Sequence, residues 1–159
     1  MMTGQKDIFA PQSGEQVLRL VLGNPLAWVV SLDAEAFWAT PLPLRPRIGA
    51  GGRIDALEGH FARSNPHSVA LKRDGRAVLL FTGPQGYISP SWMSDRTWGP
   101  TWNYAVVQFL VTIEFDETPA RLDAHLHDLV GAMELGRANA WHDPLGCRDG
   151  IKQFVVVDG

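Results

Sequence analysis

The sequence predicts an α+β domain that is mainly β and is built on a β-barrel or a strongly curved sheet. Several short segments rich in β-branched and aromatic residues alternate with turn residues, which is typical of antiparallel strands. Only two or three segments have helical spacing, and they are too irregularly placed for a doubly wound parallel sheet. The 159 residues suit one domain, with its own core or with a core completed by dimerisation.

A helix and a hairpin are expected first. Residues 13–25 begin with Ser13 three residues before Gln16, which is the spacing of a capping box, and they end at Pro25. This pattern predicts a short amphipathic helix. Residues 26–40 contain two β-rich runs around a short turn, which predicts a hairpin.

The middle of the chain mixes turns with strands. Residues 41–52 hold three prolines and three glycines, so we expect a loop or an irregular edge strand, with a wide turn at the glycines. Residues 53–62 fit a strand, residues 65–75 a short helix closing at a glycine, and residues 76–83 a buried strand ended by Gly-Pro.

The last third begins with a segment rich in aromatic residues. Residues 87–104 hold both tyrosines and three of the six tryptophans among prolines, and we expect them to form a loop. Residues 104–115 then fit a long strand. Residues 118–136 have Thr-Pro at their start and leucines at helical spacing, which predicts a helix. Residues 151–159 fit a final strand.

Composition excludes several classes of protein. Hydrophobic residues make up 45% of the chain and charged residues 19%, as in ordinary globular domains. The longest apolar run, residues 26–32, is too short to cross a bilayer, and no signal-peptide pattern is visible at the start. The single cysteine, Cys147, rules out an internal disulfide. We therefore expect a cytoplasmic protein that makes no membrane contact.

Charge is distributed unevenly. The net charge of −3 argues against direct nucleic-acid binding, which depends on neutralising phosphates. Residues 45–76 nevertheless hold seven basic and three acidic residues, so this segment is +4 and the remainder −7. Two interpretations stay open: solvated strand ends and turns, or a site for a small anion such as a phosphate group.

The sequence contains little that supports catalysis by a nucleophile or the binding of a metal ion. The sequence has no G-x-S-x-G elbow or P-loop, and Cys147 has no histidine pattern around it that would activate a thiol. His125 and His127 lie two apart on a predicted helix and point in different directions, so they cannot share a metal ion. Catalytic residues therefore stay unassigned, and no metal site is expected.

Two segments are candidates for binding. Residues 58–66 contain His60, Arg63, Ser64 and Asn65 at a turn into a helix, where backbone N–H groups, a guanidinium and a hydroxyl suit a phosphate. Asn65 could instead be no more than the helix cap before a proline.

The second candidate is the aromatic segment, residues 87–104. Its tryptophans and tyrosines offer flat apolar surface with polar edges, which suits a tricyclic heteroaromatic ligand. An aromatic subunit interface or a core plug would use the same residues.

Four segments together resemble a known family. They are ATPLPL, LEGHFARSNP, FTGPQGYISPSW and PTWNYAVV, in that order. They are similar to segments of the PaiB-type FMN-binding proteins, which are described as negative transcriptional regulators. The resemblance implies a six-stranded antiparallel split β-barrel with flanking helices, formed by one domain over residues 1–159. It also implies a homodimer with FMN in clefts between the subunits.

The resemblance also nominates residues for the cofactor. It implies that Arg63, Ser64 and Asn65, in one run with Ala62, hold the FMN phosphate, and that His60 contacts the ribityl chain or the ring. It implies that the isoalloxazine lies beside Thr40 and Leu42. Residues expected from the partner subunit or at the floor of the cleft are Tyr87, Ser89, Trp102 and Asn103.

Departures from the family pattern leave alternative functions open. Pro41 and Gln108 stand where the family has histidines, and Met93 stands where it has a tyrosine. The alternatives are a flavin-dependent NAD(P)H oxidoreductase or flavin reductase, whose cofactor supplies the chemistry, and a cofactor-free regulatory dimer.

Overall fold

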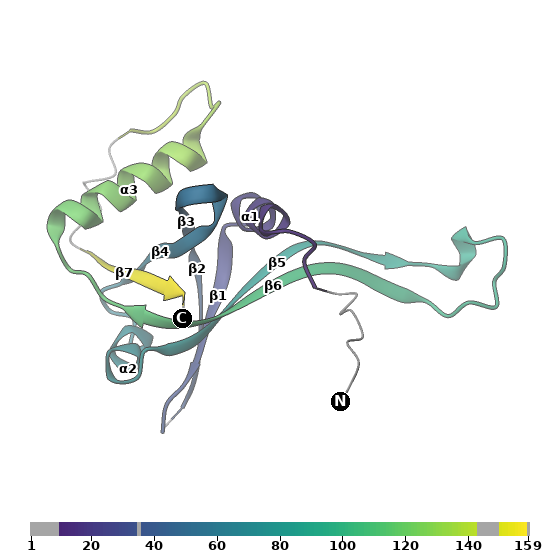
Figure 1. Ribbon diagram of the computed structural model, residues 1–159, viewed down its shortest axis with the longest axis horizontal. Helices are drawn as coiled ribbons and strands as arrows, with labels where there is room; N and C mark the ends of the chain where they lie inside the picture. Colours follow the sequence, from purple (N-terminus) through teal and green to yellow (C-terminus); the bar gives the residue numbers. More distant parts are fainter. Residues whose placement is uncertain (1–9, 35, 143–149, 159) are drawn as a thin grey trace.

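The computed structural model describes residues 10–34, 36–142 and 150–158, and its main feature is one sheet of seven antiparallel strands (Figure 1). The strand order is β2-β1-β5-β6-β7-β4-β3. The strands are β1 Leu26–Leu32, β2 Phe37–Pro43, β3 Arg45–Ile48, β4 Ile54–Ala62, β5 Arg76–Ile88, β6 Thr101–Glu114 and β7 Ile151–Asp158. The helices are α1 Gly14–Gly23, α2 His67–Arg73 and α3 Pro119–Glu134. The predicted mainly β fold with flanking helices is confirmed.

The two edges of the sheet are consecutive in the chain. β2 and β3 lie at opposite ends of the strand order, yet only Leu44 separates them. Leu44 is fully buried, and its backbone N–H donates to the Pro25 carbonyl at 2.8 Å. The sheet therefore curls until its edges meet at one corner of the chain, although the described edge strands share no ladder.

The proline-rich segment forms strands rather than a loop. Proline has no N–H to donate, so it is tolerated mainly at sheet edges, and Pro41, Pro43 and Pro46 lie in the two edge strands. This placement makes seven strands where the resemblance implied six. The expected wide turn follows as a short 3-10 turn, in which Gly51 and Gly52 have φ of 74° and 77°. Such positive φ values favour glycine.

The helices begin and end close to the predicted positions. Ser13 caps α1 by accepting from the Gln16 N–H at 3.4 Å, as the capping-box spacing predicted. α3 begins at Pro119, and Leu122, Leu126 and Leu129 are among its buried residues. The part of the chain that the structure describes has no helix long and apolar enough to cross a membrane. Cys147 lies outside the described residues.

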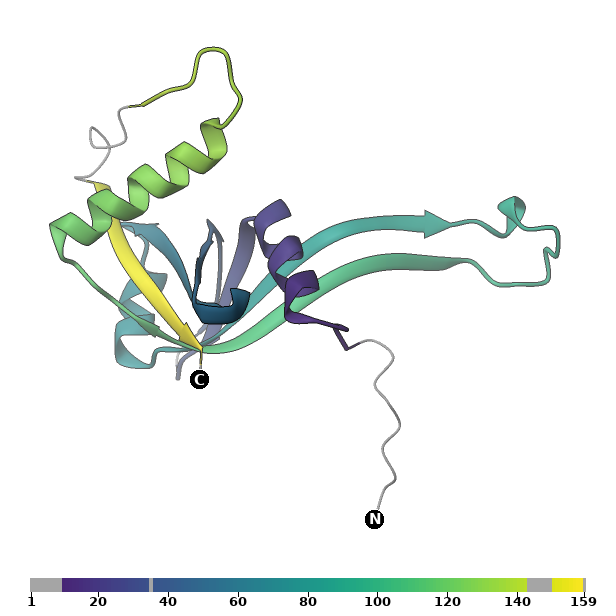
Figure 2. The same cartoon turned by 45° about the horizontal axis from the view of Figure 1, so that its top comes forward.

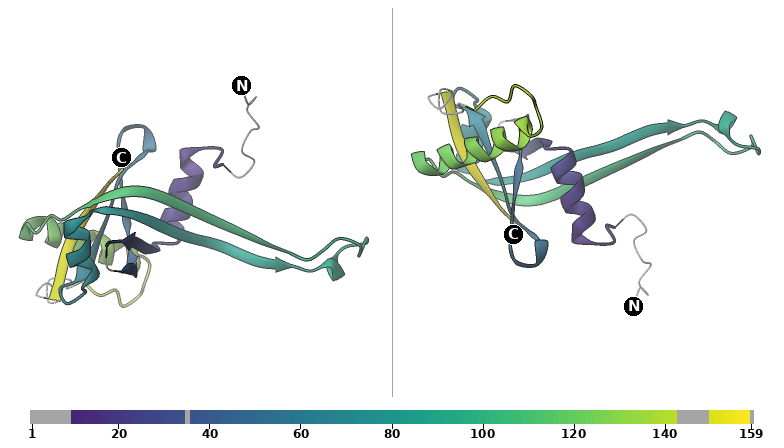
Figure 3. Two further views of the ribbon diagram at one scale, coloured as in Figure 1. Left: turned by 90° about the horizontal axis from the view of Figure 1, so that it is seen from below. Right: turned by 90° about the horizontal axis from the view of Figure 1, so that it is seen from above.

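The expectation of a loop for residues 87–104 is wrong at both ends of that segment. β5 continues past Gly83-Pro84 to Ile88, and β6 begins at Thr101. The pairing register shifts between Thr82 and Gln85, and this bulge accommodates the proline within a strand. The paired strands then project from the body as a long two-stranded arm (Figures 2 and 3).

The core lies inside the curled sheet. It joins side chains from α1, α2 and most of the strands, and Phe61, Phe81, Leu71 and Leu79 are among its fully buried members. Leu57 and Phe61 of β4 are buried members of this core. The core holds β2 and α2 in fixed positions, and the candidate site lies where these two elements meet.

Candidate functional site

The centre of the site is His67, the first residue of α2. Its side chain is completely buried. Its Nε2 lies 2.9 Å from Ser31 Oγ on β1, and its Nδ1 lies 2.8 Å from Thr40 Oγ1 on β2. One imidazole thus joins two adjacent strands to a helix and fixes the position of the predicted residue Thr40.

Asn65 lies beside this group. Its Oδ1 accepts from the His67 backbone N–H at 3.0 Å, and its Nδ2 lies 3.5 Å from Thr40 Oγ1, which is a long hydrogen bond. Asn65 therefore does cap the start of α2, the simpler of its two interpretations, and it also faces Thr40. The structure brings these two predicted residues together.

Aromatic rings enclose the imidazole. The Trp38 ring stacks on that of His67 with centroids 5.7 Å apart, and Phe61 meets it edge-on at 5.5 Å. Trp38 is held in turn by Asp33, whose Oδ2 accepts from its indole N–H at 3.1 Å. Burial lowers the pKa of His67, although Asp33 acts in the opposite direction. At neutral pH the His67 ring is therefore uncharged.

Ala62 is the last residue of β4, and Arg63 and Ser64 lie in the exposed turn between β4 and α2. The Arg63 backbone N–H donates to Gly150 at 2.7 Å, and that of Asn65 donates to Ala62 at 2.9 Å. These bonds hold the turn next to Asn65. Arg63 and Ser64 thus directly precede Asn65 in the chain and are exposed to solvent.

Most of the cations of the basic segment, residues 45–76, form ion pairs with carboxylates of the protein. Carboxylates lie within 4.0 Å of five of its seven cations, which are Arg45, Arg47, Arg53, Lys72 and Arg76. For these five residues the interpretation as solvated strand ends and turns holds. Arg63 is the member of the segment that lies at the site.

His60 lies away from this cluster. Successive residues of a strand face opposite sides, so His60 points away from the side of β4 on which Phe61 meets His67. Its Nδ1 lies 3.1 Å from Nε2 of His125 on α3. The structure therefore does not bring His60 to Thr40 and Asn65.

The side chain of Leu42 belongs to the core and is 7% exposed. A flavin beside this part of β2 could meet the backbone of Leu42 but not its buried side chain. β2 is an edge strand, so one side of its backbone has no neighbouring strand in the sheet.

The remaining predicted residues lie on the arm. Tyr87 pairs across the ribbon with Trp102, with ring centroids 5.9 Å apart, and the Trp102 indole N–H donates to Gln85 at 3.0 Å. Ser89 caps the 3-10 turn at the tip, and Asn103 is exposed. The arm that carries all four extends away from α2 and from the body of the sheet (Figure 1).

Sequence reasoning missed His67, Ser31 and Trp38. Ser31 and Trp38 lie in apolar hairpin strands, where they look like ordinary strand residues. His67 follows Asn-Pro at a helix start, and only the folded chain places it between two hydroxyl groups.

Comparison with known families decides the assignment. Residues 5–156 match the family described as "Putative FMN-binding domain". The chain belongs to this FMN-binding family. The match covers nearly the whole chain, confirms the resemblance drawn from the four segments, and supports FMN as the cofactor.

Two relatives match parts of the chain. The protease synthase and sporulation protein PAI 2 of Bacillus subtilis is 35% identical over 101 residues, covering 62% of this chain and 46% of that protein. The protein YKL070W of Saccharomyces cerevisiae is 38% identical over 55 residues, covering 32% of each. The chain thus matches less than half the length of these curated relatives.

Two solved structures share the fold of this FMN-binding family member. The FAD and heme binding protein from Mycobacterium smegmatis has a TM-score of 0.70 at 20% identity, covering 94% of this chain and 68% of that one. The flavocytochrome Anf3 from Azotobacter vinelandii has a TM-score of 0.72 at 17% identity, covering 98% and 68%. At these identities the likeness concerns the fold alone.

Proposed function

We propose that the protein binds FMN at the corner where β2 meets α2, and that it does so as a homodimer. The observation that supports this proposal most directly is the cluster itself. Thr40 and Asn65 are joined through His67, and the exposed residues Arg63 and Ser64 directly precede Asn65. The cluster thus combines polar groups for the ring or the ribityl chain with a cation and a hydroxyl for a phosphate.

These groups fit the cofactor that family membership supports. The open backbone edge of β2 provides N–H and C=O groups in line, as the polar edge of an isoalloxazine requires. Arg63 can form a forked, charge-assisted contact with a phosphate, and Ser64 adds a donor. Once bound, FMN supplies the electron or hydride transfer that side chains lack. The protein's part is to bind and orient the cofactor and to exclude water.

The homodimer is supported by one apolar surface, here called the outer face. Directly opposite residues of paired strands share a face, so Trp28 lies with Pro41 and Leu80, and Val78 lies with Leu110. Phe37 is 83% exposed there and Leu110 is 72% exposed. The outer face consists of Leu26, Trp28, Val30, Leu32, Phe37, Ala39, Pro41, Val78, Leu80, Val106, Gln108 and Leu110.

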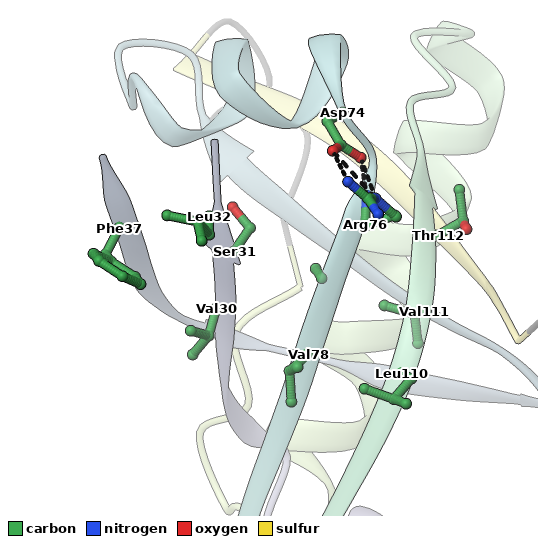
Figure 4. Close-up of a pocket in the computed structure, with 11 residues that line it drawn as sticks. Val30, Ser31, Leu32, Phe37, Asp74, Arg76, Val78, Leu110, Val111 and Thr112 are labelled. Carbon is green, nitrogen blue, oxygen red and sulfur yellow. Dashed lines mark hydrogen bonds and ion pairs between the residues drawn. The ribbon is translucent and has the colours of Figure 1, made fainter. Parts of the chain in front are cut away.

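Part of the outer face forms a hollow of about 690 Å³ (Figure 4). Val30, Leu32, Val78 and Leu110 line it, and at its rim Arg76 and Asp74 neutralise each other at 2.7 Å. Monomers rarely expose apolar patches this extensive. A two-fold interface brings a patch against its own copy, and an uncharged patch meets no like-charge repulsion there. A second copy of the chain is therefore the partner that fits.

The arm continues the outer face. Gln85 pairs with Tyr104 and Tyr87 pairs with Trp102, so these side chains share the face of Val106 and Leu110. In a dimer built on this face, the arm of one subunit extends over the other. We infer that Tyr87 and Trp102, with Ser89 at the tip of the arm, reach the FMN of the partner subunit, because their own chain keeps them far from its Thr40. Asn103 follows Trp102 on β6 and points to the opposite face of the arm, so the outer face does not carry it to the partner's FMN.

The proposal predicts that Arg63→Ala weakens FMN binding about tenfold or more while riboflavin binding changes little. Only FMN has the phosphate, and hydrogen bonds to charged groups are worth about 1.5–3 kcal/mol. Flavin fluorescence quenching measures both affinities. Arg19→Ala is the matched control, because Arg19 is an exposed arginine on α1, paired with Glu15 at 3.7 Å.

Two outcomes would count against this function. Equal losses for FMN and riboflavin in Arg63→Ala would remove the phosphate role from Arg63. A purified protein that is colourless and quenches neither flavin would overturn FMN binding as a whole.

PaiB-type proteins are described as negative transcriptional regulators. If this chain shares that role, we infer that it acts through a partner protein or a metabolite. The net charge is −3, and five of the seven cations in residues 45–76 are ion-paired. Both features disfavour phosphate-backbone contacts. A salt-sensitive mobility shift with a specific DNA sequence would contradict this inference.

A further inference from the structure

The buried hydroxyl–imidazole–hydroxyl chain of Ser31, His67 and Thr40 allows two arrangements of its protons. A neutral imidazole has one N–H donor and one acceptor nitrogen. In one arrangement Ser31 donates to Nε2, and Nδ1–H donates to Thr40. In the other, Thr40 donates to Nδ1, and Nε2–H donates to Ser31. The geometry around the two hydroxyls distinguishes them.

Ser31 favours the first arrangement. Its side chain is 8% exposed, and within the described residues its hydroxyl has His67 as its hydrogen-bond partner and no other. If Nε2–H donated to Ser31, the serine proton would be buried without an acceptor. A buried donor without a partner costs the full desolvation of that group. Donation from Ser31 to Nε2 avoids this cost, and Nδ1 then carries the proton of the ring.

The surroundings of Thr40 agree with this arrangement. Asn65 Oδ1 is occupied by the His67 backbone N–H, which turns the amide NH₂ of Asn65 toward Thr40 Oγ1. Two donors, His67 Nδ1–H and Asn65 Nδ2–H, then point at the oxygen of Thr40. The lone pairs of Thr40 Oγ1 then accept hydrogen bonds from within the protein. The proton of the Thr40 hydroxyl is directed away from both of these donors. Thr40 is half-buried, so a ligand at the corner of β2 and α2 can reach it.

The imidazole cannot easily turn to reverse the pattern. Trp38 stacks on it with an interplanar angle of 15°, and Phe61 meets it edge-on at 71°. Close-packed rings of this kind hold one orientation. The polarity of the Thr40 hydroxyl is therefore set before any ligand arrives.

We infer that the Thr40 hydroxyl is a preset hydrogen-bond donor, positioned by Ser31 and His67, for an acceptor atom on the ring or ribityl chain of a bound flavin. His67 is a positioning residue that acts through Thr40. The inference rests on the proposed function for the identity of the ligand. The protonation pattern is a property of the chain itself and can be measured without flavin.

The first test is nitrogen-15 NMR of the imidazole of His67 in the unchanged protein at pH 7, assigned by correlating its ring signals with its backbone. We expect Nδ1 to have the shift of a protonated nitrogen and Nε2 that of an unprotonated one. An imidazole whose tautomer was not fixed by its neighbours would instead exchange between the two tautomers. The opposite tautomer, an averaged signal, or a doubly protonated ring would overturn the inference.

The second test compares Thr40→Val with Thr40→Ser in flavin binding. Valine keeps the shape and the strand preference but removes the hydroxyl, while serine keeps the donor. We expect Thr40→Val to lose about tenfold in affinity for FMN and for riboflavin alike, because both share the ring and the ribityl chain. Thr40→Ser should stay within about threefold of the unchanged protein. Circular dichroism and thermal unfolding verify that both variants fold.

The outcomes separate this inference from the proposed function. If the unchanged protein binds neither flavin, the proposed function and the ligand assigned to Thr40 both fail. If it binds FMN and Thr40→Val binds equally well, the donor role of Thr40 fails while FMN binding stands. A loss confined to FMN would place Thr40 at the phosphate and would also overturn the inference.

Discussion

The histidines of this protein differ in how well their ring nitrogens are hydrogen-bonded, because the surroundings of each ring differ. His67 lies between two hydroxyl groups and can satisfy both nitrogens. His125 is 3% exposed, and its Nδ1 is buried without a hydrogen-bond partner in the described part of the chain. Burial, with smaller contributions from the neighbouring His60 and Arg45, lowers the pKa of His125 to about 4, while Asp128 acts in the opposite direction. His125 therefore favours the neutral form in the folded state.

This environment predicts an acid-sensitive contribution to stability. A histidine with a depressed pKa in the folded state takes up its proton more readily after unfolding. Its contribution is complete above about pH 6.5 and is lost as the pH falls toward 4. The loss is on the order of 3 kcal/mol for a group this deeply buried. We expect the unfolding free energy, measured with urea at pH 7.5 and pH 5, to fall less in His125→Gln than in the unchanged protein.

His127→Gln is the control for that measurement. His127 is exposed on the same helix, so this variant should lose as much stability between the two pH values as the unchanged protein does. An equal loss in His125→Gln would show that His125 is not the titrating group.

At the scale of elements, close contacts decide where turns can lie. Gly75 joins α2 to β5, and its carbonyl accepts from the Ile113 N–H of β6 at 2.8 Å. A Cβ on Gly75 would lie 2.7 Å from the Ile113 carbonyl oxygen. That oxygen belongs to the backbone of a ladder strand and cannot move aside cheaply. Gly75 is the glycine that was expected to close the helical segment. It is needed there because a side chain at this position would clash with the backbone of β6.

We predict that Gly75→Ala lowers the unfolding free energy by about 1–3 kcal/mol, as overpacking does. Gly131→Ala is the matched control. It places the same methyl group in the middle of α3, where nothing lies within 4 Å, and alanine should raise helix stability by up to about 1 kcal/mol. Chemical denaturation measures both. Equal stability changes in the two variants would contradict the close-contact explanation.

In the whole molecule, the outer face and the arm both expose large apolar side chains to solvent. A two-stranded ribbon is marginal on its own in water, and this one exposes the aromatic side chains of Trp102 and Tyr104 to solvent. In the proposed homodimer the same contact covers the outer face, supports the arm and completes the FMN site. Association and flavin binding should therefore be coupled.

We predict that Leu110→Lys converts the dimer to monomers, because it places a charge at the centre of the outer face. Analytical ultracentrifugation measures the change. The monomers should also bind FMN more weakly, since the partner's arm residues are then absent. Leu135→Lys is the control, because Leu135 follows α3, is 85% exposed and lies outside the outer face. A Leu110→Lys protein that stays dimeric would place the interface elsewhere.

Short-range sequence patterns were enough to predict most of the local elements and the family resemblance. Capping at Ser13, the strand pattern of β4 and the leucine spacing of α3 follow from short-range physics, so they were predictable. The resemblance nominated Thr40 and Asn65 as cofactor residues, and the folded chain places Asn65 Nδ2 3.5 Å from Thr40 Oγ1. Their roles in cofactor binding stay predictions. The arm was missed because local rules treat Gly83-Pro84 as a strand end, and only pairing with β6 allows a bulge there.

The tertiary structure alone decided which chemical groups meet. Ser31 and His67 are 36 residues apart, and Thr40 and His67 are 27 apart. Their contacts depend on how the sheet curls onto α2. The placement of His60 against α3, away from the cluster, depends on strand parity and on where that helix packs. Such contacts arise from long-range packing, which residue patterns do not encode locally.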